Sequence, residues 1–258
     1  LLPSEYKLTG AALATAASQV VGGAVSLFYF FGKNSSILRL GKTSWNGRVV
    51  LKACVNGSSE FMSNVSMNVV SMLYNIQLLK YAGENGVAAY GVMMYVSMIF
   101  SGAFIGYSIG TAPVIGYHYG AQNHAELKGI LKKSIKLIGV FGAFMALAAE
   151  LCAVPLGKLF VGYDFDLMSL TVSGFRIFAL SFLFMGFAIF TSSFFTALND
   201  GLTSALISFL RTLVFQVAAI LILPFVFGID GVWLSIVTAE VMAVILSAVF
   251  LKIKQKSM

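Results

Sequence analysis

The chain has 258 residues, of which 59% are hydrophobic and only 10% are charged, and its mean hydropathy is +0.90. This composition excludes a water-soluble globular domain, in which roughly a quarter of the residues are charged. A formal net charge of +7 would suit a nucleic-acid partner. However, the basic residues gather in alternate loops, which indicates membrane topology. We therefore expect a lipid bilayer and no nucleic acid as partner.

Seven apolar stretches fill almost the whole chain, each close to the roughly 20 residues that a helix needs to cross a bilayer. Backbone amides in lipid must be hydrogen-bonded within their own segment, so the crossings should be helices. The predicted fold class is an all-α integral membrane bundle of seven transmembrane helices. Pro113, Pro155 and Pro224 lie near span ends and predict that helices end there. The expected spans cover residues 8–31, 54–79, 87–112, 134–155, 168–195, 204–224 and 231–251.

The basic residues predict which side of the membrane each loop faces. Thirteen of the 17 Lys and Arg residues fall on one side, and only Lys7, Lys80, Lys158 and Arg176 fall on the other. Such an excess marks cytoplasmic loops. The C-terminus is therefore expected in the cytoplasm and the N-terminus outside. An external start with Leu and without a signal sequence predicts a fragment that begins between two spans.

The second span carries a stripe of polar residues, which is the strongest functional signal in the chain. At about 100° per residue, its members fall within an arc of roughly 120° on one helix face. We expect this face to line a substrate or ion pathway. The alternative is hydrogen bonding between helices, each bond contributing about 0.6–2 kcal/mol. The stripe consists of Asn56, Glu60, Asn64, Asn68, Ser71 and Asn75.

Glu60 is the sharpest single candidate in this stripe. An ionised side chain near the bilayer centre costs about 2.5–3.5 kcal/mol on insertion scales, so Glu60 should be neutral, hydrated, paired or bound to a cation. A carboxyl that exchanges a proton or a cation is what coupled transport needs. The alternative is a hydrogen bond to a neighbouring span.

Other charged residues lie within or beside the spans. Glu240 is a second intramembrane acid, for which we favour a structural partner. Arg176 lies towards the outer side and could pair with Glu150 or with lipid headgroups. Arg211 is expected to extend to the cytoplasmic face.

The residue patterns of enzymes and metal sites are missing. The sequence holds no phosphate loop, no metal-spaced histidine pair and no Ser-His-Asp set. Cys54 and Cys152 fit small apolar positions in or beside spans and not a disulfide or metal pair. We expect a protein that is not an enzyme and that holds neither a metal nor a cofactor.

Several landmarks follow one another along the chain: Gly10–Thr15 with Ser18 and Gln19, Asn56–Phe61, Tyr119–Asn123, and Phe194–Gly201 followed by Ser204 and Arg211. In their order and spacing, the chain resembles the C-terminal half of a multidrug and toxic compound extrusion (MATE) transporter of the bacterial drug-exporting type. The likeness covers essentially all 258 residues.

The resemblance implies twelve helices in two six-helix lobes around a central cleft. Residues 1–31 would then be the last helix of the N-lobe, 32–52 a basic cytoplasmic linker, and 53–258 the six-helix C-lobe. It also implies antiport in a bacterial inner membrane, where inward Na⁺ or H⁺ movement drives the export of amphipathic, often cationic drugs. Glu60 fits a coupling residue by its type, and the stripe would line the cleft. The missing N-lobe would be a partner within the same polypeptide.

Two other functions stay open from the sequence. A flippase for lipid-linked oligosaccharides, from the same superfamily, would need intramembrane Lys or Arg residues that bind phosphates, and the chain offers little beyond Arg176. A seven-helix membrane receptor would match the helix count and the external N-terminus, but the non-Met start and the family-like landmarks argue against it.

Overall fold

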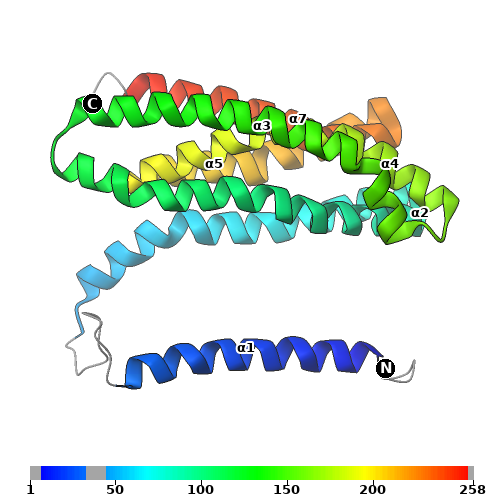
Figure 1. Ribbon diagram of the computed structural model, residues 1–258, viewed down its shortest axis with the longest axis horizontal. Helices are drawn as coiled ribbons and strands as arrows, with labels where there is room; N and C mark the ends of the chain where they lie inside the picture. Colours follow the sequence, from blue (N-terminus) through cyan, green and yellow to red (C-terminus); the bar gives the residue numbers. More distant parts are fainter. Residues whose placement is uncertain (1–6, 33–44, 255–258) are drawn as a thin grey trace. The chain divides into compact units, whose positions relative to one another are not determined.

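The structure, a computed structural model, describes residues 7–32 and 45–254, without the side chains of residues 7, 8, 11, 55–60, 62 and 63. Within this part, every regular element is a helix (Figure 1). The chain divides into two compact units, Leu1–Arg48 and Val49–Met258. In order, the helices are α1 (Lys7–Phe31), α2 (Gly47–Gly120), α3 (His124–Val161), α4 (Phe165–Ala179), α5 (Phe182–Ala197), α6 (Gly201–Phe209), the π-helix η2 (Leu210–Phe215) and α7 (Gln216–Lys254).

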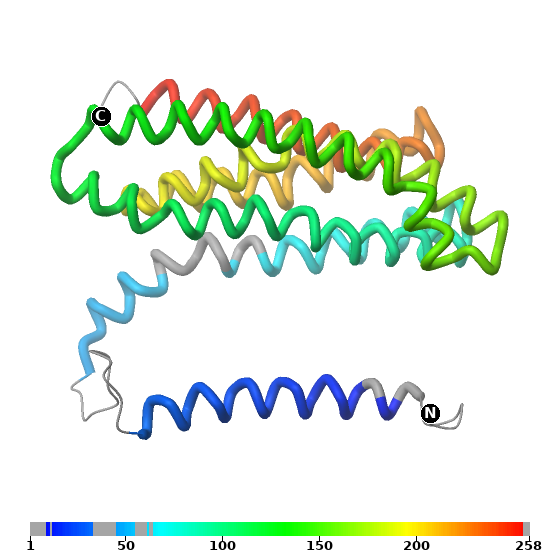
Figure 2. Tube along the Cα trace, in the orientation of Figure 1, coloured from blue at the N-terminus to red at the C-terminus, as the bar shows by residue number. Residues whose placement is uncertain are grey.

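Two of these helices, α2 and α7, are hairpins. Gly83 in α2 (φ 62°, ψ −153°) and Gly228 in α7 (φ 57°, ψ −132°) have non-helical backbone angles in the left-handed half of φ/ψ space. Glycine enters this region without the steric penalty of a Cβ atom. Figures 1 and 2 show the first half of α2, in cyan, followed by a green second half that runs back along the bundle. Each hairpin therefore supplies two of the predicted crossings.

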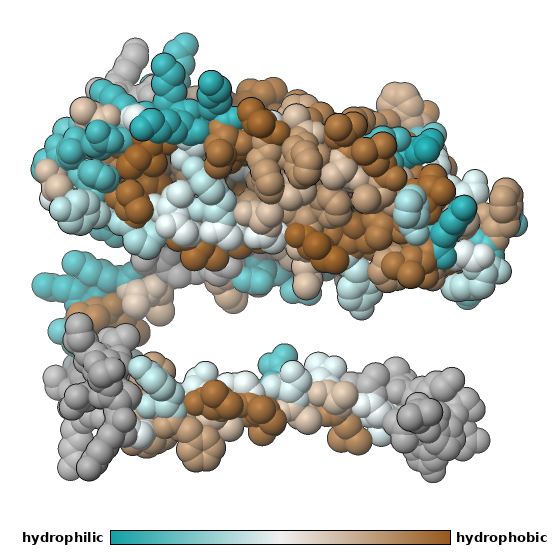
Figure 3. Space-filling model, viewed as in Figure 1, coloured by the Kyte–Doolittle hydropathy of each residue, from teal (hydrophilic) through white to brown (hydrophobic). Residues whose placement is uncertain are grey.

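The lengths and composition of the helices fit a membrane protein. Four helical stretches of the described chain are long and apolar enough to cross a bilayer: Ala12–Phe31, Asn64–Gly120, His124–Val161 and Gly201–Lys254. The fifth expected span, 168–195, is instead a bent pair in which α4 and α5 meet at 51°. Figure 3 shows hydrophobic residues over the middle of the bundle and hydrophilic ones towards its two ends. The expected all-α membrane fold is confirmed.

Short turns with capped helix starts connect the crossings. Asn123, Asp164 and Asp200 each accept a hydrogen bond from a backbone N–H in the first turn of α3, α4 and α6, at 3.2, 3.0 and 3.2 Å. These caps satisfy amides that have no partner inside the helix. Gln122 and Asn199, which precede two of the caps, have positive φ values of 55° and 60°. The chain therefore turns at Gln122 and Asn199 directly before α3 and α6.

The prediction that prolines end the helices was wrong. Pro113, Pro155 and Pro224 all lie inside helices, and α2, α3 and α7 continue beyond them. A membrane helix tolerates proline because neighbouring groups satisfy the carbonyl that the ring leaves free. The chain reverses at Gly83 and Gly228 instead.

The core of the second unit is aromatic and packs closely against small residues. Trp233 of α7 is fully buried, as are Phe178 and Phe182. A Cβ atom on Gly174 of α4 would lie 2.7 Å from the Trp233 indole, so only glycine fits at this crossing. This packing fixes the second half of α7 against α4.

Asp200 allows a test of what stabilises the start of α6. It both caps this helix and forms an ion pair, and different substitutions remove one or both of these interactions. Its carboxylate accepts from the Thr203 hydroxyl at 2.8 Å and pairs with the Lys254 ammonium at 2.7 Å, with both side chains partly exposed. Desolvation raises the pKa of Asp200, but the hydrogen bonds and charge of Lys254 and the bonds from Thr203 outweigh it and hold the pKa below 3.8.

We predict that D200A lowers the free energy of unfolding by about 1 kcal/mol, whereas D200N, which keeps the cap, loses less than about 0.5 kcal/mol. Because the folded pKa is depressed, the carboxylate stabilises the fold above pH 3.8 and this contribution disappears as pH falls through the folded pKa. Thermal unfolding in detergent at neutral and acidic pH measures both effects. Equal losses in the two variants would show that the ion pair, and not the cap, dominates.

Candidate functional site

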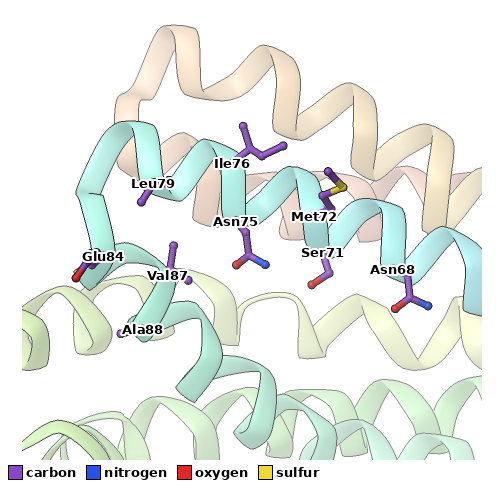
Figure 4. A pocket seen from close by; sticks show the side chains of 9 residues that line it. All are labelled: Asn68, Ser71, Met72, Asn75, Ile76, Leu79, Glu84, Val87 and Ala88. Carbon is purple, nitrogen blue, oxygen red and sulfur yellow. The ribbon is translucent and has the colours of Figure 1, made fainter. Parts of the chain in front are cut away.

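The stripe of α2 borders a hollow of about 760 Å³ beside the Gly83 reversal (Figure 4). Asn68, Ser71 and Asn75 lie on one helix face because they are three and four residues apart, and Figure 4 shows their side chains pointing to the same side. The second half of the α2 hairpin completes the wall. The lining residues are Asn68, Ser71, Met72, Asn75, Ile76, Leu79, Glu84, Val87 and Ala88.

The chemistry of this lining is amphipathic. Two amides and a hydroxyl supply donors and acceptors, while Met72, Ile76 and Leu79 supply flexible apolar surface. Pockets for small organic molecules typically measure about 300–1,000 Å³ and combine apolar walls with a few polar groups. The hollow fits that description in both size and composition.

The structure places the other members of the stripe differently. Asn64 is exposed one turn before Asn68, and its backbone carbonyl accepts a hydrogen bond of 2.9 Å from the Asn68 amide. The side chains of Asn56 and Glu60 lie outside the described residues. The predicted cavity residues Asn68, Ser71 and Asn75 thus meet at the hollow, while Asn64 lies beyond its lining.

Glu84 is a lining residue that the sequence pattern of the stripe did not predict. It follows Gly83 directly, so the reversal of the hairpin brings it back to the wall of the hollow. The sequence did contain a signal for this role of Glu84: it is an acid that directly follows a helix-breaking glycine at the end of the polar stripe. Its carboxylate gives the hollow a group that attracts cations.

A buried ion pair links η2 to the second half of α7. Arg211 Nε donates to both carboxylate oxygens of Glu240, at 3.1 and 2.9 Å, and Arg211 Nη2 donates to Oε1 at 2.7 Å. Glu240 is only 1% exposed, and the Arg211 side chain is 16% exposed. The expectation that Arg211 extends to the cytoplasmic face was therefore wrong, because an acid lies within its reach inside the bundle.

Two buried tyrosines stack where the two halves of α2 meet. The rings of Tyr74 and Tyr90, from the two halves of α2, are 5.2 Å apart and parallel within 2°. The buried Tyr74 hydroxyl has no hydrogen-bond partner within the described part of the chain. Ser71, which lines the hollow, is the polar neighbour of the Tyr90 hydroxyl.

A cluster of hydroxyls connects α5 to α6 and was not foreseen from the sequence. Ser192 Oγ lies 2.9 Å from Ser204 Oγ and 2.8 Å from Ser208 Oγ, and Thr196 Oγ1 lies 2.7 Å from Ser204 Oγ. The alternation of Ser and Thr over successive turns of two adjacent spans was the available signal. Because these hydroxyls satisfy one another, the cluster serves helix packing.

Arg176 Nε lies 3.1 Å from Glu150 Oε1, which is the first of the two alternatives that we expected. Both side chains are about half exposed. Across residues 7–32 and 45–254, no three His, Cys, Asp or Glu side chains come close enough together to hold a metal ion.

Comparison with known proteins identifies the family of this chain. The model of the MatE family matches residues 61–222. The chain is 24% identical over 243 residues to the multidrug export protein MepA of Staphylococcus saprophyticus, covering 92% of this chain and 52% of that protein. MepA of Staphylococcus haemolyticus is also 24% identical, over 241 residues, with 93% and 52% coverage. The chain thus spans about half the length of these relatives.

The fold agrees with a solved transporter structure. A MATE crystal structure in complex with MaL6 superposes with a TM-score of 0.85 at 24% sequence identity, covering 98% of this chain and 57% of that one. At this identity the likeness shows the fold alone. Since the family model matches well over half of the residues, the chain belongs to the MatE family.

Proposed function

We propose that this chain forms the C-terminal half of a cation-coupled antiporter that exports amphipathic or cationic organic compounds. The observation that carries the proposal is the hollow of about 760 Å³ on α2, where amide and hydroxyl groups lie beside Met72, Ile76, Leu79 and a carboxylate. Its mixture of polar and apolar walls suits amphipathic molecules, and Glu84 suits a positive charge. The multidrug export relatives, which are about twice as long, support the same assignment.

The proposal includes the arrangement of the whole transporter. Residues 1–31 would be the last helix of an N-lobe, 32–52 the linker, and 53–258 the C-lobe, with an N-terminal half facing the hollow. The C-terminus would lie in the cytoplasm, as the 13 basic residues on its side of the membrane indicate. We place the protein in the plasma membrane of a bacterium, since the matched relatives are staphylococcal.

Glu60 remains our candidate for coupling to Na⁺ or H⁺. It belongs to the same polar face as Asn68 and Asn75 by sequence spacing, so an ion there would share the water-filled gap with the substrate. A carboxyl in that position binds either a proton or a cation, and each changes the charge that an organic cation meets.

The charge of the hollow favours drug export over a lipid-linked sugar flippase. Its lining contains the acid Glu84 and neither Lys nor Arg. A phosphate-bearing lipid would be repelled by that carboxylate, whereas an organic cation would be attracted.

Replacing the two amides of the hollow tests the proposed substrate site. We predict that N68L/N75L in the complete transporter reduces drug efflux about tenfold, because two polar contacts of roughly 0.6–1.7 kcal/mol each are lost. Dye efflux from cells or vesicles measures this loss. The matched control is Q77L, on the same helix but outside the lining, which should transport normally. Unchanged efflux in N68L/N75L would contradict the site.

The coupling role of Glu60 has a separate test. We predict that E60Q abolishes efflux driven by an imposed Na⁺ or H⁺ gradient, because an amide neither takes up a proton nor neutralises a cation. Membrane insertion, followed by protein amount in the membrane fraction, should stay intact. E126Q, which changes an exposed acid at the start of α3, is the control. Gradient-driven efflux in E60Q would remove this residue from the mechanism.

A further inference from the structure

A second groove, of about 500 Å³, lies on α4 beside the last turns of α3 and shares no lining residue with the hollow. The two helices pack side by side after the turn that joins them (Figure 1). Val154 of α3 and Met168 and Val172 of α4 give the groove apolar walls. These walls are firmly placed, because a Cβ atom on Gly157 of α3 would lie 2.6 Å from Val172 Cγ2.

One edge of this groove is polar. Ser169, Ser173 and Arg176 line it, and their spacing of four and three residues puts them on one face of α4. All three are exposed. The Arg176 guanidinium lies against Glu150 of α3, and the two side chains are 54% and 47% exposed. The groove therefore combines apolar walls with hydroxyls and with one charge of each sign.

The Glu150–Arg176 pair lies well inside the span and not at its end. Counted from the turn between α3 and α4, both residues lie roughly 16 Å along their helices. Leu147 and Leu151, beside Glu150 on α3, are 61% and 70% exposed, as expected of a surface that faces hydrocarbon. Charged groups exposed at such a depth are costly unless polar groups surround them. The pair thus needs a polar partner that comes from the membrane.

The contact within this pair leaves capacity for such a partner. Arg211 donates three hydrogen bonds to Glu240 inside the bundle, whereas Arg176 approaches Glu150 through Nε at 3.1 Å. A guanidinium has five N–H donors, and a carboxylate has about four acceptor positions. A half-exposed pair joined in this way offers donors to an anion and acceptors to a cation on the same surface.

We propose that this groove binds one molecule of phosphatidylethanolamine from the bilayer. The lipid phosphate accepts hydrogen bonds from the Arg176 guanidinium and the Ser173 hydroxyl. The lipid ammonium, which two carbons separate from the phosphate oxygen, donates to the Glu150 carboxylate. An acyl chain lies against Met168 and Val172. The inference goes beyond the proposed export function and does not depend on it.

The charge pattern selects this headgroup among common phospholipids. Phosphatidylglycerol brings a phosphate for Arg176 but no cation for Glu150, so its charge would meet that carboxylate without compensation. Phosphatidylcholine has a quaternary ammonium, which carries no N–H and cannot donate a hydrogen bond to Glu150. A primary ammonium supplies both the charge and the donors, and hydrogen bonds between charged groups are the stronger kind.

Native mass spectrometry of the complete transporter tests the site. Delipidated protein in a mild detergent receives phosphatidylethanolamine, phosphatidylcholine and phosphatidylglycerol in equal amounts. We predict that one phosphatidylethanolamine is retained in preference to the other two. R176Q should lower its retention about tenfold, because charged hydrogen bonds to the phosphate are lost. E150Q should remove the preference over phosphatidylcholine while phosphatidylglycerol is retained at least as well as before.

Two further variants serve as controls. K254Q makes the same charge change as R176Q but breaks the Lys254–Asp200 pair outside the groove, and it should retain the lipid normally. E150Q/R176Q leaves no unpaired charge, so it should fold and show no preference among the three lipids. Circular dichroism of each variant shows that a lost preference does not come from an unfolded chain.

A photoreactive phosphatidylethanolamine analogue locates the bound lipid. We expect the unmodified transporter to be labelled within residues 165–177 and R176Q to lose this label. Equal retention of the three lipids by the unmodified transporter, or equal labelling in R176Q, would show only general lipid contact and overturn the site. Absence of any retained lipid, as when the other half of the transporter covers the groove, would overturn it too. Efflux measured on the same variants tests the proposed function separately, since a transporter without efflux that still selects phosphatidylethanolamine would keep the lipid site.

Discussion

Inside a bilayer the protein itself must satisfy every backbone N–H and C=O, and the form of this chain follows from that constraint. The crossings are helical, and the reversals are confined to places where the lost bonds have substitutes. Caps such as Asn123 and Asp200 serve that purpose at the start of α3 and α6. At Gly83 and Gly228, the absence of a Cβ atom lets the backbone turn within a few residues.

The same constraint applies to side chains and divides them into two groups. Several buried or partly buried polar residues have partners inside the bundle, as in the Arg211–Glu240 pair and the hydroxyls around Ser192. The polar residues of α2 behave differently, since Asn68 and Asn75 are exposed beside a hollow. Amides that a membrane helix keeps on such a face are suited to water, an ion or a ligand.

Much of the fold was predictable because each membrane crossing requires a long, continuous stretch of hydrophobic residues. The polar face of α2 was also predictable, since Asn68, Ser71 and Asn75 follow a local helical spacing. The partner of Arg211 was not predictable from such patterns, because Glu240 lies 29 residues away across the Gly228 reversal. Counted from Gly228, the two residues differ in depth by about five positions, or roughly 8 Å, which the arginine side chain bridges.

The first half of α2 presents one face to the hollow and another to the protein interior. Asn75 is exposed at the hollow, while its neighbour Tyr74 is fully buried towards α7. Consecutive residues of a helix are about 100° apart, so one rotation of this helix would move both faces at once. A movement of this helix at the hollow would therefore also shift the packing around the buried Tyr74.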